Sequence, residues 1–272
     1  MPISIDPLLP HAIPFLVVLA RIAGLMLIAP MLSSTSIPRM VKLLLLVALT
    51  ACVYPALPID TTDIPLAQDL YTLAPLIVCE MAVGFTIGLM ALMPLISVQI
   101  GGLMMGQQMG LGIAALADPN SEVTGDALAR LFYLTVLTSF ILVGGLELMV
   151  GAVLETFSRV PLGAYRLDMS TVDLVVALLT ASFEVALRVS MPIVVVIFLE
   201  NIVVGFLMRT IPGLNIMNFG FPLRILLGVA AVIGTLLFIG TVATSDIDRV
   251  ADAIMYWVDG LGPRAPIGGG GA

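Results

Sequence analysis

The sequence contains few charged residues, and this shortage excludes most soluble proteins. Only 11% of the 272 residues are charged, whereas 60% are hydrophobic. A soluble domain carries about a quarter charged residues, because water must solvate its surface. Lysine occurs once, at Lys42, and no cluster of basic residues offers a surface for nucleic acid. The composition therefore predicts an integral membrane protein that binds lipid and no nucleic acid.

Histidine and cysteine are also scarce, which limits metal and nucleophile chemistry. The single histidine, His11, lies near the N-terminus. Neither a histidine-containing zinc site nor a serine–histidine dyad can therefore be assembled. Cys52 and Cys79 lie in apolar runs, where we expect small buried hydrophobic residues. Since no stretch has the pattern of a phosphate-binding or dinucleotide-binding loop either, we predict no enzymatic activity, no metal and no cofactor.

Long apolar runs dominate the rest of the sequence. Each is long enough to cross much of a bilayer, and backbone amides in lipid have no water to bond, so each run should be helical. No basic residue precedes the first run, as a cleavable signal peptide would require, so we expect that run to be retained. The predicted fold is an all-α membrane protein with about six long hydrophobic helices. The runs are Pro14–Leu32, Leu43–Leu57, Leu70–Val98, Leu128–Leu154, Leu174–Met208 and Ile225–Val242.

The charges between the runs predict an orientation. Short loops rich in lysine and arginine stay in the cytoplasm. Two segments qualify, one with Arg39 and Lys42 and the other from Arg209 to Arg224. The acidic segment 60–69 and the C-terminal end would then lie on the opposite side. An even number of spans places both ends of the chain on the same side, so six spans with both ends outside agree with these charges.

Six charged residues interrupt the apolar runs. A charge at bilayer depth costs at least ~2.5 kcal/mol and must find a partner or water. Glu184 and Arg188 are four residues apart, so on a helix they share a face and can pair. The charges either fix helix register as ion pairs, or line a polar pathway for ions or protons, or belong to helices that do not all lie in lipid. We predict six buried charges: Arg21, Glu80, Glu147, Glu184, Arg188 and Glu200.

Glycines repeat at two places in the third run and just after it. Gly84 and Gly88 are four residues apart, a spacing that predicts close helix packing in membranes. The stretch GGLMMGQQMGLG, from Gly101 to Gly112, holds five glycines, each of which weakens a helix by roughly 1 kcal/mol relative to alanine. This composition favours a flexible loop inside protein or against a water-lined cavity. Helix packing is the alternative.

Three groups of motifs follow one another from Pro14 to about Gly240. They are PFLVVLARIAGLMLIAP with IPRMVKLLLLVAL, then GQQMGLG leading to ADP, then MPIVVVIFLENIVVGFLMRTIPGLNIMNFGFPLRILLG. Their order and spacing resemble the FliR family of flagellar and type III secretion export-gate proteins. The NFGFPLR segment is closer to flagellar members than to virulence-system members. Gly213 departs from the family, because many members have a larger polar residue there.

The resemblance implies a subunit of a protein channel. Members join FliP and FliQ in a gate through which unfolded flagellar proteins cross the bacterial inner membrane, within the flagellar basal body and close to FlhB. By this resemblance residues 1–160 form a FliP-like helical region and residues 170–245 a FliQ-like helical hairpin. Residues 246–272 are an acidic and then glycine-rich tail. Much of the bundle would be raised above the membrane plane.

The resemblance also assigns two sites, and one alternative function stays open. The predicted pore plug comprises Gly101, Gly102, Met104, Met105, Gly106, Gln107, Gln108, Met109 and Gly110. The predicted cytoplasmic entrance loop comprises Arg209, Pro212, Asn215, Phe221, Pro222 and Arg224. The alternative is a secondary transporter with an intramembrane charged site. Transporters often show paired, inverted interruptions in two halves, and this sequence has none.

Overall fold

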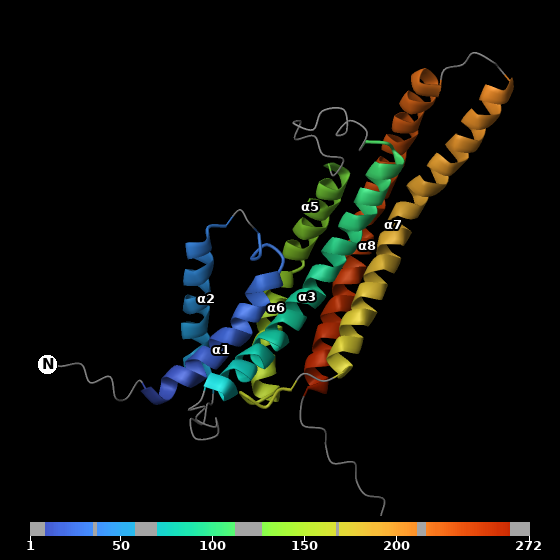
Figure 1. Cartoon of the computed structure of the whole chain (residues 1–272). Coiled ribbons are helices and arrows are strands. Elements are labelled where there is room, and N and C mark those ends of the chain that lie inside the picture. Colours follow the sequence, from blue (N-terminus) through green and yellow to red (C-terminus); the bar gives the residue numbers. More distant parts are fainter. Residues whose placement is uncertain are drawn as a thin grey trace, which may run out of the picture. The chain divides into compact units, whose positions relative to one another are not determined.

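The computed structural model describes residues 9–34, 37–57, 70–111, 127–166, 169–210 and 216–261 (Figure 1). All regular structure in these residues is helical, which confirms the predicted all-α membrane fold. The elements are α1 (Leu9–Ile28), α2 (Arg39–Val53), the 3-10 turn η1 (Tyr54–Ala56), α3 (Leu70–Gln108), α5 (Ala127–Leu142), α6 (Gly145–Arg159), α7 (Met169–Thr210) and α8 (Ile216–Gly260).

The number of possible membrane spans agrees with the sequence. Five helices in the described residues are long and apolar enough to cross a membrane, and the pair α5 and α6 adds a sixth as a broken span. The break falls at Val143 and Gly144, and Gly144 has a φ of +83°. This left-handed conformation favours glycine. The predicted run Leu128–Leu154 is therefore two helices and not one.

Contacts divide the chain into two units, and α3, α7 and α8 each contribute to both. The first unit comprises 1–92, 144–175 and 248–272, and the second comprises 93–143 and 176–247. This division by contacts differs from the division of the sequence at residues 160–170. The FliP-like character of residues 1–160 and the FliQ-like character of residues 170–245 stay predictions.

In the first unit, α1 and α3 approach each other through glycines. A Cβ atom on Gly84 would lie 1.9 Å from the carbonyl oxygen of Arg21, and one on Gly24 would lie 2.1 Å from that of Met81. A Cβ on Gly88 would lie 3.0 Å from the carbonyl oxygen of Leu25. Only glycine fits at Gly24 and Gly84, because any side chain would push the two backbones apart. The packing predicted for Gly84 and Gly88 is confirmed.

The predicted acidic tail is wrong over residues 246–260, which form the end of α8. Ile247, Ile254 and Val258 of this stretch are buried. Their spacing of seven and four residues places them on one helix face, which is buried, while the acidic residues between them are exposed. Trp257 and Leu261 pack against a buried cluster in the first unit. Residues 262–272 of the predicted tail lie outside the described residues.

In the second unit, the predicted loop at Gly101–Gly112 is wrong up to Gln108, because α3 continues to that residue. A Cβ on Gly101 would lie 3.1 Å from the carbonyl oxygen of Ala186 in α7. One on Gly102 would lie 3.0 Å from the Cα of Ala129 in α5. The glycines therefore allow three helices to approach closely, and this packing offsets their low helix propensity.

The predicted entrance loop Arg209–Arg224 is also shorter than expected. Helix α7 includes Arg209 and ends at Thr210, and α8 begins at Ile216. Phe221, Pro222 and Arg224 therefore belong to a helix, since membrane helices tolerate an interior proline. Pro212 and Asn215 lie outside the described residues.

We expect Gly84→Ala to lower the free energy of unfolding by about 1–3 kcal/mol, the usual range for overpacking. The control is Gly151→Ala in α6, where an added Cβ would meet nothing within 4 Å. This control should be neutral or slightly stabilising, because alanine is the better helix former. The aggregation temperature of the chain in detergent extracts of membranes measures both. Equal behaviour of the two variants would contradict the close packing of α1 and α3.

Candidate functional site

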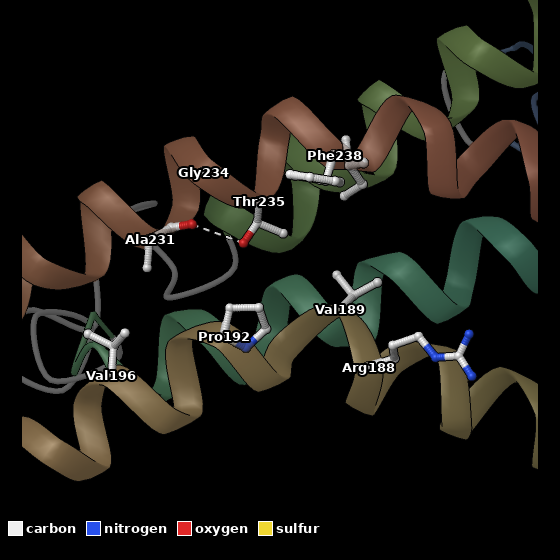
Figure 2. A pocket seen from close by; sticks show the side chains of 9 residues that line it. Arg188, Val189, Pro192, Val196, Ala231, Gly234, Thr235 and Phe238 are labelled. Atoms are coloured by element: carbon white, nitrogen blue, oxygen red, sulfur yellow. Dashed lines mark hydrogen bonds between the residues drawn. The ribbon is translucent and has the colours of Figure 1, made fainter.

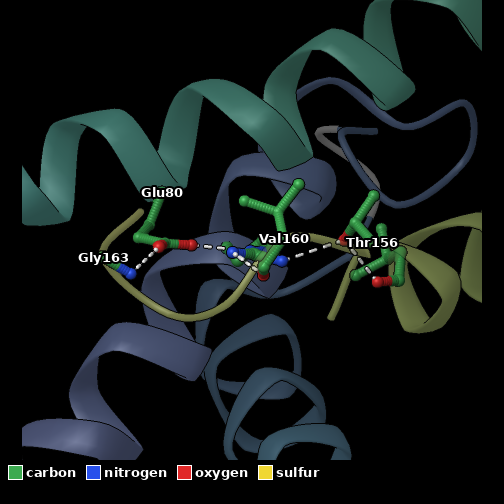
Figure 3. A network of polar contacts seen from close by, with 6 residues as sticks. Glu80, Thr156, Val160 and Gly163 are labelled. Atoms are coloured by element: carbon green, nitrogen blue, oxygen red, sulfur yellow. Dashed lines mark hydrogen bonds and ion pairs between the residues drawn. The ribbon is translucent and has the colours of Figure 1, made fainter. Parts of the chain in front are cut away.

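A buried polar network in the first unit includes Glu80, Thr156 and Val160, and Arg21 bonds to all three (Figure 3). The Nε of Arg21 donates to Glu80 Oε2 over 2.6 Å. Its Nη1 donates to Thr156 Oγ1 over 3.2 Å, and its Nη2 to the carbonyl oxygen of Val160 over 3.4 Å. The other carboxylate oxygen of Glu80 accepts from the backbone N–H of Gly163 over 2.8 Å. The network thus joins α1, α3, α6 and the segment that follows α6.

The surroundings of this pair are those of a protein interior. The side chains of Arg21 and Glu80 are both fully buried. The guanidinium carbon lies 4.4 Å from the centre of the Phe157 ring, within the range of a cation–π contact. Isolated charges in such a place are costly, whereas a paired and hydrogen-bonded set is tolerated. The arrangement holds the three helices α1, α3 and α6 together.

A second buried acid, Glu200, lies in the second unit on the hairpin of α7 and α8. The Nε of Arg224 is 3.3 Å from Glu200 Oε2, and its Nη2 donates to the side-chain oxygen of Asn201. The Glu200 side chain is 2% exposed and that of Arg224 is 30% exposed. Arg224, predicted to belong to the entrance loop, therefore holds the two helices of the hairpin together.

The other three predicted buried charges are exposed in this chain. Glu184 and Arg188 form the ion pair that their spacing predicts, with 3.0 Å between nitrogen and oxygen. Their side chains are 71% and 64% exposed, and Glu147 is also exposed. The single chain therefore does not bury Glu147, Glu184 or Arg188, and their burial by the membrane or by partner subunits stays a prediction. Helical periodicity turns these residues away from the neighbouring helices.

Arg188 borders an apolar groove between α7 and α8 within the second unit (Figure 2). The groove has a volume of about 430 Å³. Arg188 lies near one end, and Val196 and Ala231 lie near the other. Thr235, whose hydroxyl donates to the carbonyl oxygen of Ala231, offers no free donor to a ligand. This surface is suited to apolar contacts.

The three methionines of the predicted plug pack inside the second unit. Met105 and Met109 are buried, and Met104 is partly buried. Met109 covers Gly228 of α8, where an added Cβ would lie 2.5 Å from the methionine Cγ. The hydroxyl of Ser190 in α7 donates to the sulfur of Met104 over 3.7 Å. The methionines therefore join the end of α3 to α7 and α8.

The end of α3 is a glycine-terminated helix cap. Gly110 has a φ of +77°, and its N–H donates to the carbonyl oxygen of Gln107 over 3.0 Å. The N–H of Leu111 donates to the carbonyl oxygen of Gly106 over 3.1 Å. These two bonds and the left-handed glycine form a Schellman motif. Gln107 and Gln108 are exposed beside it.

Sequence reasoning did not find several members of these networks. Thr156 and the backbone of Gly163 complete the contacts of Arg21 and Glu80, and Asn201 completes those of Arg224. One signal for the first network exists in the sequence. Arg21 lies near Gly24 in one apolar run, and Glu80 lies near Gly84 in another. Two helices that pack closely through glycines and form an ion pair require this combination.

Comparison with known proteins decides the family. Residues 12–250 match the family described as bacterial export proteins, family 1. The chain belongs to this family. It is therefore a bacterial export protein, and its apolar helices make it a multi-pass membrane protein.

This export protein is similar to flagellar biosynthetic proteins and to a secretion system apparatus protein. The flagellar biosynthetic protein FliR of Escherichia coli (strain K12) is 28% identical over 212 residues, covering 78% of this chain and 80% of the relative. The FliR of Bacillus subtilis (strain 168) is 29% identical over 149 residues, covering 54% and 58%. The secretion system apparatus protein SsaT of Salmonella typhimurium is 24% identical over 209 residues, covering 76% and 80%.

We expect Arg21→Ala and Glu80→Ala each to lower the free energy of unfolding by about 3–5 kcal/mol, because each leaves a buried charge without its partner. The double variant Arg21→Met/Glu80→Met should recover most of that loss, since no charge then stays buried. The aggregation temperature in membrane extracts provides the measurement. As a control, Glu184→Ala and Arg188→Ala should each cost less than about 1 kcal/mol, as exposed pairs do. Additive losses in the double variant would show that the two residues act separately.

Proposed function

We propose that this chain is a core subunit of the flagellar type III export gate. In this proposal it forms, with FliP-like and FliQ-like subunits, the channel through which unfolded flagellar proteins cross the bacterial inner membrane. The observation that carries the proposal is the family match over residues 12–250, together with a FliR relative covered over 80% of its length. The secretion relative SsaT supports the wider type III assignment.

The apolar surface of α7 supports a role inside a larger assembly. Its apolar segment, Thr171–Thr210, has 40 residues, and only about a fifth of these are buried. At 1.5 Å per residue this segment is about 60 Å long, whereas the hydrocarbon core of a bilayer is about 30 Å thick. Lipid can therefore cover about half of it. The exposed side chains include Leu187, Met191, Val195, Phe198, Leu199, Ile202, Val203 and Phe206.

The remaining half of this surface requires apolar neighbours outside the lipid. Other subunits with similar helices provide such neighbours, which is why we assign FliP-like and FliQ-like partners to the chain. The same reasoning favours a bundle that is partly raised above the membrane. In this proposal the region 1–160 replaces a FliP-like subunit, the hairpin 170–245 replaces a FliQ-like subunit, and an FlhB-like protein lies near Arg209 on the cytoplasmic side.

The buried charges favour a scaffold over a secondary transporter. A transport site needs a charge that a substrate or ion can reach. Arg21 and Glu80 are fully buried and bonded to protein groups, and Glu200 is paired with Arg224. Within the described residues, every buried side-chain nitrogen or oxygen has a hydrogen-bond partner.

We assign the gate of this channel to the end of α3. A closed export channel must hold back ions and still yield to a chain with varied side chains. Methionine is suited to this, because its unbranched apolar side chain repacks around irregular shapes. Met109 covers Gly228 of α8, Met105 is also buried, and the glycine cap at Gly110 ends α3.

Co-expression tests the assembly. Because α7 needs neighbours, the chain expressed alone should be degraded or aggregated, and co-expression with its FliP-like and FliQ-like neighbours should restore a soluble complex in mild detergent. A strain without the chain should not swim or secrete flagellar subunits until the chain is supplied again. Size-exclusion chromatography and a motility assay measure the two effects. A stable, monodisperse monomer, or normal swimming without the chain, would contradict the proposal.

Two triple variants test the gate. Met104→Ser/Met105→Ser/Met109→Ser makes the seal polar, so we expect cells with the assembled complex to become permeable to small ions. Met104→Leu/Met105→Leu/Met109→Leu keeps the apolar volume but removes flexibility, so membranes should stay tight while export slows. Ion permeability and secretion are measured in parallel, after co-purification has shown that each complex assembles. If the assembled serine variant stays tight, the seal lies elsewhere in the channel.

A further inference from the structure

A second groove lies in the first unit, between α2, α1 and α3. The wall from α2 consists of Arg39, Lys42, Leu43 and Leu46. These positions are separated by three, one and three residues, so they form a single face of the helix. The face is basic at the beginning of α2 and apolar from the second turn onward.

The opposite walls of this groove are apolar. Ala23, Met26 and Leu27 come from α1, with the same spacing along one face, and Met81 comes from α3. The groove has a volume of about 280 Å³. Helix α2 itself is largely uncovered, since only 11% of the window Arg39–Ala56 is buried. An occupant would therefore complete the packing of this helix.

The positive charges on the rim have no acidic partner among the residues that the structure describes. Neither Arg39 nor Lys42 forms an ion pair there. Glu80, which precedes Met81 on α3, is already paired with Arg21. The first turn of α2 has no acidic residue, and Pro38 before it provides no side-chain cap. The positive end of the helix dipole thus adds to the two cations, and together they favour an anion.

The order of charge and hydrophobicity along this wall favours an anionic amphiphile as the occupant. From Arg39 to Leu46 the wall rises about 10 Å along α2. The two cations lie at its beginning, and the apolar side chains of Leu43 and Leu46 follow them. A negatively charged headgroup with an acyl chain has the complementary charge and the same order of polar and apolar groups.

We propose that this groove binds an anionic phospholipid. The phosphate lies between Arg39 and Lys42 at the start of α2, and one acyl chain lies along Leu43 and Leu46 against α1 and α3. Basic pockets between membrane helices on the cytoplasmic side are suited to anionic headgroups. The predicted orientation places Arg39 and Lys42 on that side. This site goes beyond the export function, because its ligand belongs to the membrane and is not exported.

Lipid titration of the full chain, co-purified with its neighbouring subunits, tests the site. Native mass spectrometry counts bound phosphatidylglycerol and phosphatidylcholine of equal chain length after delipidation in mild detergent. We expect a preference for phosphatidylglycerol in the wild type. Arg39→Gln/Lys42→Gln should weaken phosphatidylglycerol binding about thirtyfold, since a basic residue at an anionic membrane surface contributes about fivefold. The matched control, Arg130→Gln/Arg166→Gln, removes two other exposed cations, neither of them in the predicted entrance loop, and should change nothing.

Two more variants keep the test decisive if the glutamine variant fails to fold. Arg39→Lys/Lys42→Arg retains both charges and should retain the preference. Ala23→Leu fills the groove from α1 and should weaken long-chain phosphatidylglycerol much more than its short-chain analogue. Inorganic phosphate should not displace the lipid, because it has no acyl chain. Displacement by phosphate, equal binding of the two lipids, or unchanged binding in Ala23→Leu would overturn the proposal. Loss of a neighbouring subunit from the Arg39→Gln/Lys42→Gln complex, with lipid binding unchanged, would also overturn it and identify a protein-docking surface.

Discussion

The close approach of α1 and α3 is the contact on which the first unit depends. Without side chains at Gly24 and Gly84, the two backbones come near enough for Arg21 to reach Glu80 inside an apolar protein. The pair then fixes more than two helices, because its remaining polar atoms bind α6 at Thr156 and the backbone at Gly163. A charge that could be tolerated only with partners thus determines where four segments meet.

In the hairpin of α7 and α8 an ion pair also holds two helices together, but this pair is less completely buried. Glu200 is almost fully buried, whereas its partner Arg224 stays partly exposed and also binds Asn201. The Glu184–Arg188 pair lies on the outer surface and connects nothing but one helix to itself. The two pairs with buried acids hold different helices together, whereas the exposed Glu184–Arg188 pair lies on one helix. Burial therefore distinguishes the pairs that stabilise helix packing from the pair that does not.

Local features of the fold could be predicted from the sequence, whereas distant contacts could not. The apolar runs had to be helices because lipid leaves the backbone no other partner, and the pairing of Glu184 with Arg188 follows from helical spacing. The partner of Arg21 lies 59 residues away, so no local pattern points to it. Gly101 and Gly102 favour a loop by composition, but Ala186 and Ala129 approach them from other helices and stabilise α3 there. The end of α8 is hard to recognise in the sequence, because acidic residues interrupt the buried stripe of Ile247, Ile254 and Val258.

The length of α7 has a consequence for how this protein can vary. Its outward positions are mostly apolar along about 60 Å, with the Glu184–Arg188 pair among the exceptions, although a bilayer can solvate only about half of that distance. Against lipid, one apolar side chain replaces another with little penalty, because lipid tails rearrange around any shape. Against a packed protein surface, the same exchange changes the volume and destabilises the contact. Tolerance of mutation along this helix would therefore change at the membrane boundary while hydrophobicity does not, so that the pattern of permitted shapes, and not the hydropathy, marks where the membrane ends.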